Sequence, residues 1–112
     1  LAILRAVHQA GIPIVAGTDE GVPGFSVYRE VELFTQFGMT PMQAIQAATV
    51  VGARAMGMAD SLGTVEVGKL ADLIVLDGNP LDRISNIRRV ELVMKGGMLY
   101  RTRDIWRAIG FR

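Results

Sequence analysis

A short apolar run at residues 12–16 stands directly before Gly17, Thr18 and Asp19. Because the run is apolar throughout and closely bounded by glycine, it predicts a strand buried on both faces, as in a parallel sheet. Pro13 lies near its start, where a strand can lose one backbone donor. Such a strand would carry the Asp19 carboxylate at its C-terminal end, which is where α/β barrels hold their catalytic groups.

The composition is that of a globular chain. It has 112 residues, of which 50% are hydrophobic, so it can form one domain core and is too apolar for disorder. The formal net charge is +1 and the charges are interspersed without a basic stripe, so we expect no nucleic-acid partner. No apolar run approaches the ~20 residues of a membrane span, so we expect no membrane partner either.

The cysteine count and the first residues limit the setting further. No cysteine is present, which excludes disulfides and thiolate metal ligands. The N-terminus lacks the charged and then apolar layout of a signal peptide, and we expect a cytoplasmic protein. The sequence begins with Leu1 in what reads as the middle of a helix, which favours a fragment or a processed chain.

The first half of the chain shows helical spacing of its apolar residues. Residues 1–10 predict the end of a helix, and Gly11 suits a left-handed cap at its C-terminus. Ser26 can cap a second helix over residues 27–37, which Gly38 would end.

The clearest local signal is a capping box. Thr40 and Gln43 have the spacing at which each side chain satisfies the other's backbone, and Pro41 suits the first helical position. We therefore predict a helix over residues 41–56, which Gly57 would end. One side of this helix would carry a stripe of small residues at Ala44, Ala48, Val51 and Ala55.

The second half has the residue pattern of β-strands and turns. We predict strands near residues 64–67, 73–76, 90–94 and 98–100, and a short helix near residues 104–109 that carries Trp106. Gly96 and Gly97 have the form of a two-residue hairpin turn. The change in composition near residues 57–63 divides the chain into two expected domains, residues 1–57 and residues 58–112.

The order of these motifs resembles the C-terminal end of the amidohydrolase superfamily. The resemblance rests on Asp19 in its strand-end context and on residues 68–81, which read GKLADLIVLDGNPL. It runs from about residue 11 to residue 100. The superfamily consists of metal-dependent hydrolases, among them imidazolonepropionase and prolidase-like enzymes. The resemblance implies an α/β fold: the last strand and helices of a (β/α)8 TIM barrel in residues 1–57, then part of a small β-sandwich domain and the terminal helix in residues 58–112.

The resemblance also implies a role for Asp19. In the superfamily the last barrel strand ends in an aspartate that binds the metal and handles the proton of the attacking water, and Asp19 matches that position. We therefore expect Asp19 to be both a catalytic residue and a ligand of a divalent metal, with zinc as the expected ion. The superfamily's His-x-His pair has no match here, so most metal ligands would lie outside this chain. From its spacing alone, without the resemblance, a turn or cap role would be the commoner one for Asp19.

Other polar residues have weaker claims. Glu20, Tyr28, Arg29 and Glu30 could line a substrate pocket or belong to a solvated surface. Many relatives have a histidine where Tyr28 stands, so no role is carried over to that position.

Several charged residues have a structural interpretation. Lys69 and Asp72 belong to the segment that resembles the small β domain, so we expect Asp72 to order the turn into a strand and Lys69 to be a turn or surface residue. Asp77, Asn79 and Asp82 are expected to form turns. His8, the only histidine, has no partner at metal-ligand spacing and is expected to be a surface or packing residue.

Two functions remain open from the sequence. In the first, the chain is part of a hydrolase that cleaves a carbon–nitrogen bond of a small amide, a cyclic amide or a dipeptide with metal-activated water. The chain alone would then be inactive, and its partner would be the remainder of its barrel or a second copy. In the second, it is a truncated or split fragment that acts only as a folding or interaction module.

Overall fold

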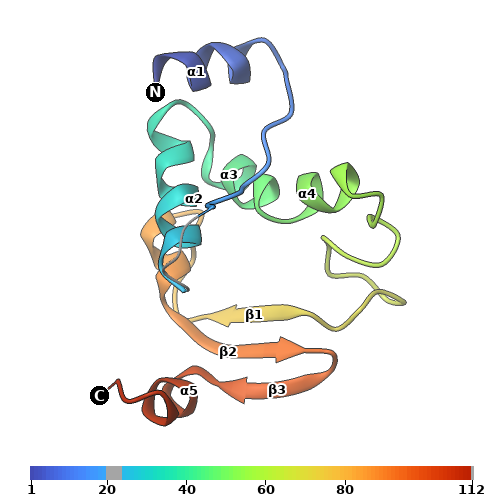
Figure 1. Ribbon diagram of the computed structural model, residues 1–112, viewed down its shortest axis with the longest axis vertical. Coiled ribbons are helices and arrows are strands. Elements are labelled where there is room, and N and C mark those ends of the chain that lie inside the picture. Colours follow the sequence, from blue (N-terminus) through green and yellow to red (C-terminus); the bar gives the residue numbers. More distant parts are fainter. Residues whose placement is uncertain (20–23, 112) are drawn as a thin grey trace.

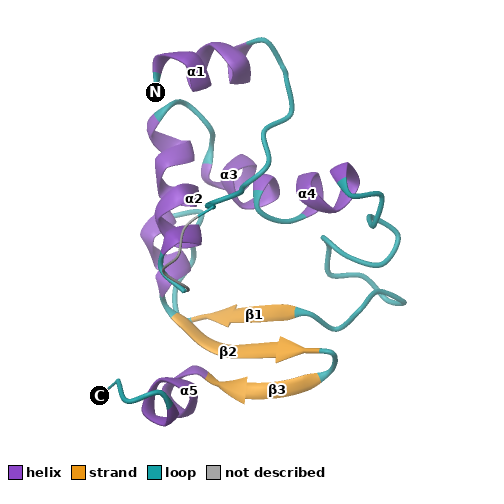
Figure 2. Cartoon of the chain, viewed as in Figure 1, coloured by secondary structure: helices purple, strands orange, loops and turns teal. Residues whose placement is uncertain are grey.

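The computed structural model describes residues 1–19 and 24–111 and confirms an α/β chain (Figures 1 and 2). The helices are α1 (Ala2–Gln9), α2 (Ser26–Gln36), α3 (Pro41–Ala47), α4 (Val50–Ala55), the 3₁₀ helix η1 (Ile84–Arg88) and α5 (Thr102–Ala108). The strands are β1 (Leu73–Leu76), β2 (Val90–Lys95) and β3 (Met98–Arg101). Figure 1 shows α1 to α4 on one side of the sheet and α5 beside β3. We call residues 1–57 the helical region and residues 58–112 the tail.

The buried core lies between α2 and α3. It consists of Val31, Phe34, Phe37, Met39, Ala44 and Ala47. The rings of Phe34 and Phe37 meet edge to face with their centres 5.6 Å apart. The spacing of Val31 and Phe34 puts both on the inner face of α2, and the alanines of α3 allow that helix to approach closely. Ile84 and Ile87 of the tail pack against the same core.

The capping box at the start of α3 is confirmed. The backbone N–H of Gln43 donates to Thr40 Oγ1 at 3.2 Å. The backbone N–H of Thr40 donates to the side-chain Oε1 of Gln43 at 2.9 Å. Pro41 occupies the first turn, where its missing donor costs nothing. The prediction of a single helix over residues 41–56 was wrong, because α3 ends at Ala47 and α4 begins at Val50.

The break between α3 and α4 has a local cause. The Thr49 hydroxyl donates to the carbonyl of Ile45 at 2.8 Å, and the amides of Ala48 and Thr49 bond three residues back instead of four. Such back-bonding competes with the regular helical ladder and bends or ends helices. The helix α2 also differs in detail from the prediction, since Phe25 is its N-cap and Ser26 is its first residue.

The predicted strand at residues 12–16 was also wrong, because this extended segment belongs to no sheet within the described part of the chain. Ile14 and Ala16 pack against the core, while Ile12 and Val15 are 55% and 42% exposed. This alternation is that of a strand with one covered face. A strand also needs a neighbour for its backbone groups, and the described residues supply none beside it.

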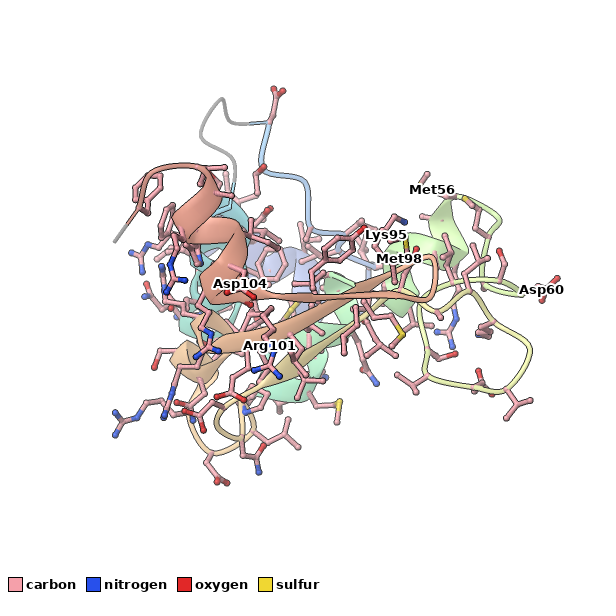
Figure 3. All side chains as sticks on the ribbon, turned by 90° about the horizontal axis from the view of Figure 1, so that it is seen from below. Met56, Asp60, Lys95, Met98, Arg101 and Asp104 are labelled. Carbon is pink, nitrogen blue, oxygen red and sulfur yellow. The ribbon has the colours of Figure 1, made fainter. Side chains whose placement is uncertain are left out.

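The tail forms one antiparallel sheet in the order β1-β2-β3. Leu73 lies opposite Met94, and Lys95 lies opposite Met98. Gly96 and Gly97 have φ angles of 57° and 81°, which fits the predicted two-residue hairpin turn. Figure 3 shows Lys95 and Met98 near this turn and Arg101 farther along β3.

The segment 64–67 was expected to be a strand and is not one. Side chains hold it as a loop instead. Lys69 Nζ donates to the carbonyl of Ala59 at 2.7 Å and to the Thr64 hydroxyl, and it pairs with Glu66 at 3.0 Å. The alternating pattern therefore arose from a loop whose polar residues face one lysine.

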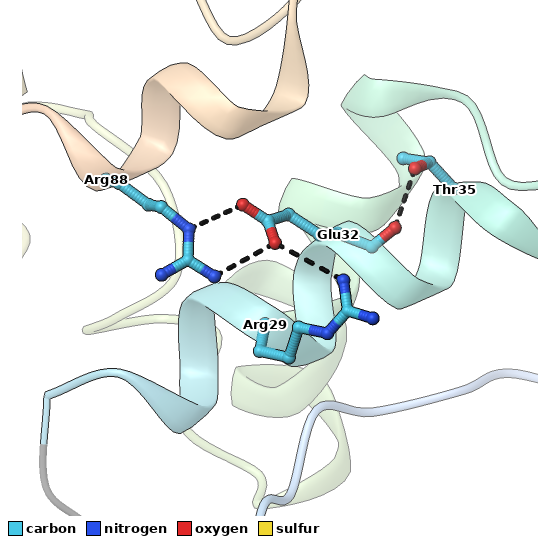
Figure 4. A network of polar contacts seen from close by, with 4 residues as sticks. All are labelled: Arg29, Glu32, Thr35 and Arg88. Carbon is cyan, nitrogen blue, oxygen red and sulfur yellow. Dashed lines mark hydrogen bonds and ion pairs between the residues drawn. The ribbon is translucent and has the colours of Figure 1, made fainter.

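An ion pair joins the helical region to the tail (Figure 4). Arg88 of η1 donates to the Glu32 carboxylate of α2 through Nε at 2.6 Å and through Nη2 at 2.9 Å. The Arg88 guanidinium holds the pKa of Glu32 below its ordinary value, while partial burial of that carboxyl acts in the opposite direction. Arg29 lies 3.7 Å from the same carboxylate, so two cations share one anion.

Candidate active site

Asp19 follows the extended segment and is the last described residue before α2 is approached at residue 24. It is exposed and has a φ angle of +45°, in the left-handed region. Non-glycine residues seldom adopt this conformation, although aspartate tolerates it better than most. The residue predicted to be catalytic therefore has an unusual backbone geometry that its surroundings must maintain.

Two helices hold the end of the extended segment. The Ala16 amide donates to the carbonyl of Ala47, at the end of α3, at 3.0 Å. The next amide, that of Gly17, donates to Glu30 Oε1 on α2 at 3.1 Å. Asp19 thus lies two residues beyond Gly17, where the backbone is hydrogen-bonded to both α2 and α3.

Of the other candidate residues named from the sequence, one contacts the segment that leads to Asp19. Glu20 lies outside the described residues. Glu30 contacts the segment that leads to Asp19, as described above, whereas Arg29 is exposed and pairs with Glu32. Tyr28 is half-buried on α2. The sequence offered no signal for the contact of Glu30 with Gly17, since a glutamate in the first turns of a helix usually faces solvent.

The described residues do not by themselves form a metal site. Across residues 1–19 and 24–111, no group of three or more His, Cys, Asp or Glu side chains is placed to hold a metal ion. His8 packs its ring edge-on against Phe37, with the ring centres 6.2 Å apart, as expected for a packing residue. Asp19 could supply one ligand, and a complete site would need further ligands from outside this chain.

Asp72 lies at the base of the tail sheet. Its carboxylate accepts hydrogen bonds from Lys95 Nζ at 2.6 Å and from the Gly96 amide at 2.7 Å. The Lys95 ammonium, together with the Gly96 amide, lowers the pKa of the Asp72 carboxyl. Asp72 therefore attaches the hairpin turn to the residues before β1, which agrees with its expected structural role.

The turn after β1 is held by similar contacts. Asp77 pairs with Arg89, and Asn79 Oδ1 accepts the amide of Leu81 at 2.9 Å. The Asn86 side chain donates to the carbonyl of Asn79 at 2.9 Å. The turn roles expected for Asp77 and Asn79 are confirmed.

The comparisons with known proteins agree with these features. The sequence profile described as "Amidohydrolase family" matches residues 1–99, so the chain belongs to the amidohydrolase family. An imidazolonepropionase of Shouchella clausii is 32% identical over an alignment of 103 positions, and the match covers 85% of this chain and 23% of that protein. A 5-methylthioadenosine/S-adenosylhomocysteine deaminase of Teredinibacter turnerae is 32% identical over an alignment of 112 positions, and the match covers 90% of this chain and 25% of that protein.

Solved structures show the same relation. A crystal structure of a Xaa-Pro dipeptidase with bound methionine in the active site superposes with a TM-score of 0.82 at 40% identity. The match covers 89% of this chain and 25% of that one. The chain thus spans about a quarter of the length of the relatives it matches. No helix within the described residues is long and apolar enough to cross a membrane.

Proposed function

We propose that this chain is the C-terminal part of a metal-dependent amidohydrolase that cleaves a carbon–nitrogen bond. Residues 1–57 would contribute the last strand and helices of a (β/α)8 barrel. Residues 58–112 would contribute part of a β-sandwich and the terminal helix. The observation that carries the proposal is the placement of Asp19 after an extended segment held between two helices, within the residues that match the family.

In this proposal Asp19 is a ligand of the metal and the base of the reaction. The chemistry that such a cation, with zinc as the expected ion, would supply when bound is a lowered pKa of its coordinated water. The Asp19 carboxylate accepts a proton from the attacking water and passes it to the leaving nitrogen. One short carboxylate, two residues beyond a hydrogen-bonded backbone, suits both proton transfers.

The substrate would be a small molecule with an amide-type bond. The similar proteins are an imidazolonepropionase, a deaminase and a Xaa-Pro dipeptidase, and these names together support carbon–nitrogen bond cleavage. We propose a cyclic amide, a small amide or a dipeptide as the substrate class. The chain alone would be inactive and would associate with the remainder of its barrel or with a second copy.

A second candidate is a non-catalytic module. It is favoured by the core between α2 and α3, which gives the helical region packing of its own. It also accounts for the lack of a metal-binding group among the described residues. An upstream reading frame without a His-x-His motif or further barrel strands would favour this candidate over the hydrolase.

The test of the hydrolase is Asp19→Asn in the full-length enzyme. The substitution keeps the shape of the side chain and removes the base, so we expect turnover to fall by at least ~100-fold. Asp72→Asn is the control, because it weakens the contacts of the hairpin turn without touching the site. It should lower stability and leave turnover per folded molecule unchanged. Turnover of the Asp19→Asn enzyme near that of the wild type would refute the assignment.

A further inference from the structure

Glu30, on α2, makes a side-chain hydrogen bond to the segment that leads to Asp19. Its Oε1 accepts the Gly17 amide at 3.1 Å, across 13 residues of sequence. Gly17 lies two residues before Asp19, whose φ angle of +45° needs support from its surroundings. Glu30 therefore holds the backbone two residues before the candidate catalytic carboxylate.

The second oxygen of Glu30 gives an independent observation. Oε2 is buried and has no hydrogen-bond partner, and it shares this state with only Thr102 Oγ1 among the described side-chain atoms. Buried polar atoms are almost always paired, so an unpaired carboxylate oxygen at this place requires an explanation. Among the described residues, the Gly17 amide is therefore the hydrogen-bond partner that stabilises this partly buried carboxylate, through Oε1 alone.

We propose that Glu30 is a positioning residue for Asp19. Its Oε1 fixes the Gly17 amide while the Ala47 carbonyl fixes the Ala16 amide, and the two bonds together set the direction in which the chain leaves the extended segment. The left-handed turn at Asp19 then places the carboxylate in one orientation. This inference rests on the proposed function, because it assigns Glu30 to the reaction that Asp19 would perform.

The experiment uses the full-length enzyme with two substitutions. Glu30→Leu keeps the size of the side chain and removes the acceptor, whereas Glu30→Gln keeps an oxygen that can accept the Gly17 amide. A displacement of about 1 Å at a reacting group costs on the order of 100-fold in rate. We therefore expect Glu30→Leu to lower kcat roughly 10- to 100-fold with KM changed less than about 3-fold. The kcat of Glu30→Gln should stay within about 5-fold of the wild type.

Hydrogen exchange of the peptide that covers residues 12–19 supplies a readout independent of activity. Glu30→Leu should raise exchange in this peptide, since it frees the Gly17 amide, and Glu30→Gln should not. If the leucine variant fails to fold, Glu30→Asp replaces it, because its shorter side chain cannot reach Gly17. Loss of both kcat and exchange protection in the short variant, with recovery in Glu30→Gln, supports the proposal.

Three results would overturn it. One is wild-type kcat in the leucine or aspartate variant. Another is an equal loss of kcat in Glu30→Gln, which would show that the charge matters and the Gly17 contact does not. The third is unchanged exchange of the 12–19 peptide in every variant. If the wild-type enzyme hydrolyses no carbon–nitrogen bond, the proposed function fails, and the exchange arm still decides whether Glu30 holds Gly17.

Discussion

The helical region and the tail are stabilised by different kinds of contact. Every buried residue of the described structure lies between Val31 and Ala53, in or beside α2, α3 and α4. The described part of the tail has none. Its sheet is held by backbone ladders and by the Asp72 carboxylate, and the loop before the sheet is held by Lys69. The helical region thus depends on apolar packing, and the tail on hydrogen bonds and ion pairs.

The difference indicates where each region is incomplete. The extended segment before Asp19 has one covered face and no neighbouring strand in the described residues, while the sheet has strands and no core. Between α4 and β1 lies an open groove of about 640 Å³, lined by Val15, Gly52, Met56, Leu70 and Ile74 among others. These apolar surfaces fit a chain that spans about a quarter of its relatives' length.

The largest effect on stability should come from the core. Phe37 is fully buried, and Phe37→Ala should lower the free energy of unfolding by about 3–5 kcal/mol because it leaves a cavity. Val75→Ala in the sheet is the matched case, since Val75 is 42% exposed, and it should cost less than about 1 kcal/mol. Urea denaturation followed by circular dichroism measures both. Equal losses would contradict the contrast between the two regions.

A smaller effect should come from Gly63, at the junction of the regions. A Cβ there would lie 2.8 Å from Ala53 Cβ and 2.8 Å from Val50 Cα, and φ is +96°. Gly63→Ala should therefore cost about 1–3 kcal/mol. Gly68 has a φ of +93° and open space around it, so Gly68→Ala carries the backbone strain without the clash. If Gly68→Ala were as destabilising as Gly63→Ala in urea, close packing against α4 would not explain the effect.

The smallest effect should come from the ion pair that joins the regions. The pKa of Glu32 is lower in the folded chain than its ordinary value. The ion pair therefore stabilises the folded state at pH values above that ordinary pKa. This contribution is lost as the pH falls through the lowered pKa. The Arg88 side chain is 38% exposed, so solvent screens its attraction to Glu32. We therefore expect Glu32→Gln to lower the free energy of unfolding by about 1 kcal/mol at neutral pH.

The matched control for the ion pair is Glu91→Gln, on an exposed position of β2. Urea denaturation measures the free energy of unfolding at pH 7 and at pH 3. We expect the difference between these two values to be smaller in Glu32→Gln than in the wild type. Glu91→Gln should leave that difference nearly unchanged. An identical pH dependence in both variants would mean that the pair does not couple the helical region to the tail.

The features of the fold that the sequence predicted correctly are those set by residues close together in the chain. The capping box at Thr40 and the hairpin turn at Gly96 each depend on residues within a few positions, and both are confirmed. The break at Thr49 escaped prediction because one hydroxyl bonds to a carbonyl four residues back and interrupts a pattern that otherwise reads as one helix. The apolar run at residues 12–16 predicts a strand buried on both faces, whereas the described residues cover one face of this segment and leave Ile12 and Val15 exposed.

The candidate site was less predictable than the fold. The position of Asp19 came from a family resemblance, and its left-handed backbone could not be read from residue types. Glu30 meets Gly17 across 13 residues, and Glu32 meets Arg88 across 56 residues. Contacts of this kind depend on how helices are placed in three dimensions, and a single sequence carries no periodic signal for them.

The central claim is that this chain supplies Asp19 to an active site that residues outside it complete. Calorimetric titration of the purified 112-residue chain with zinc, paired with a hydrolysis assay on dipeptides and cyclic amides, tests it most directly. A catalytic zinc normally takes three protein ligands plus water, and Asp19 is the one ligand that we propose for this chain. We expect no stoichiometric binding in the micromolar range and no turnover. Stoichiometric micromolar binding together with metal-dependent turnover would contradict the account.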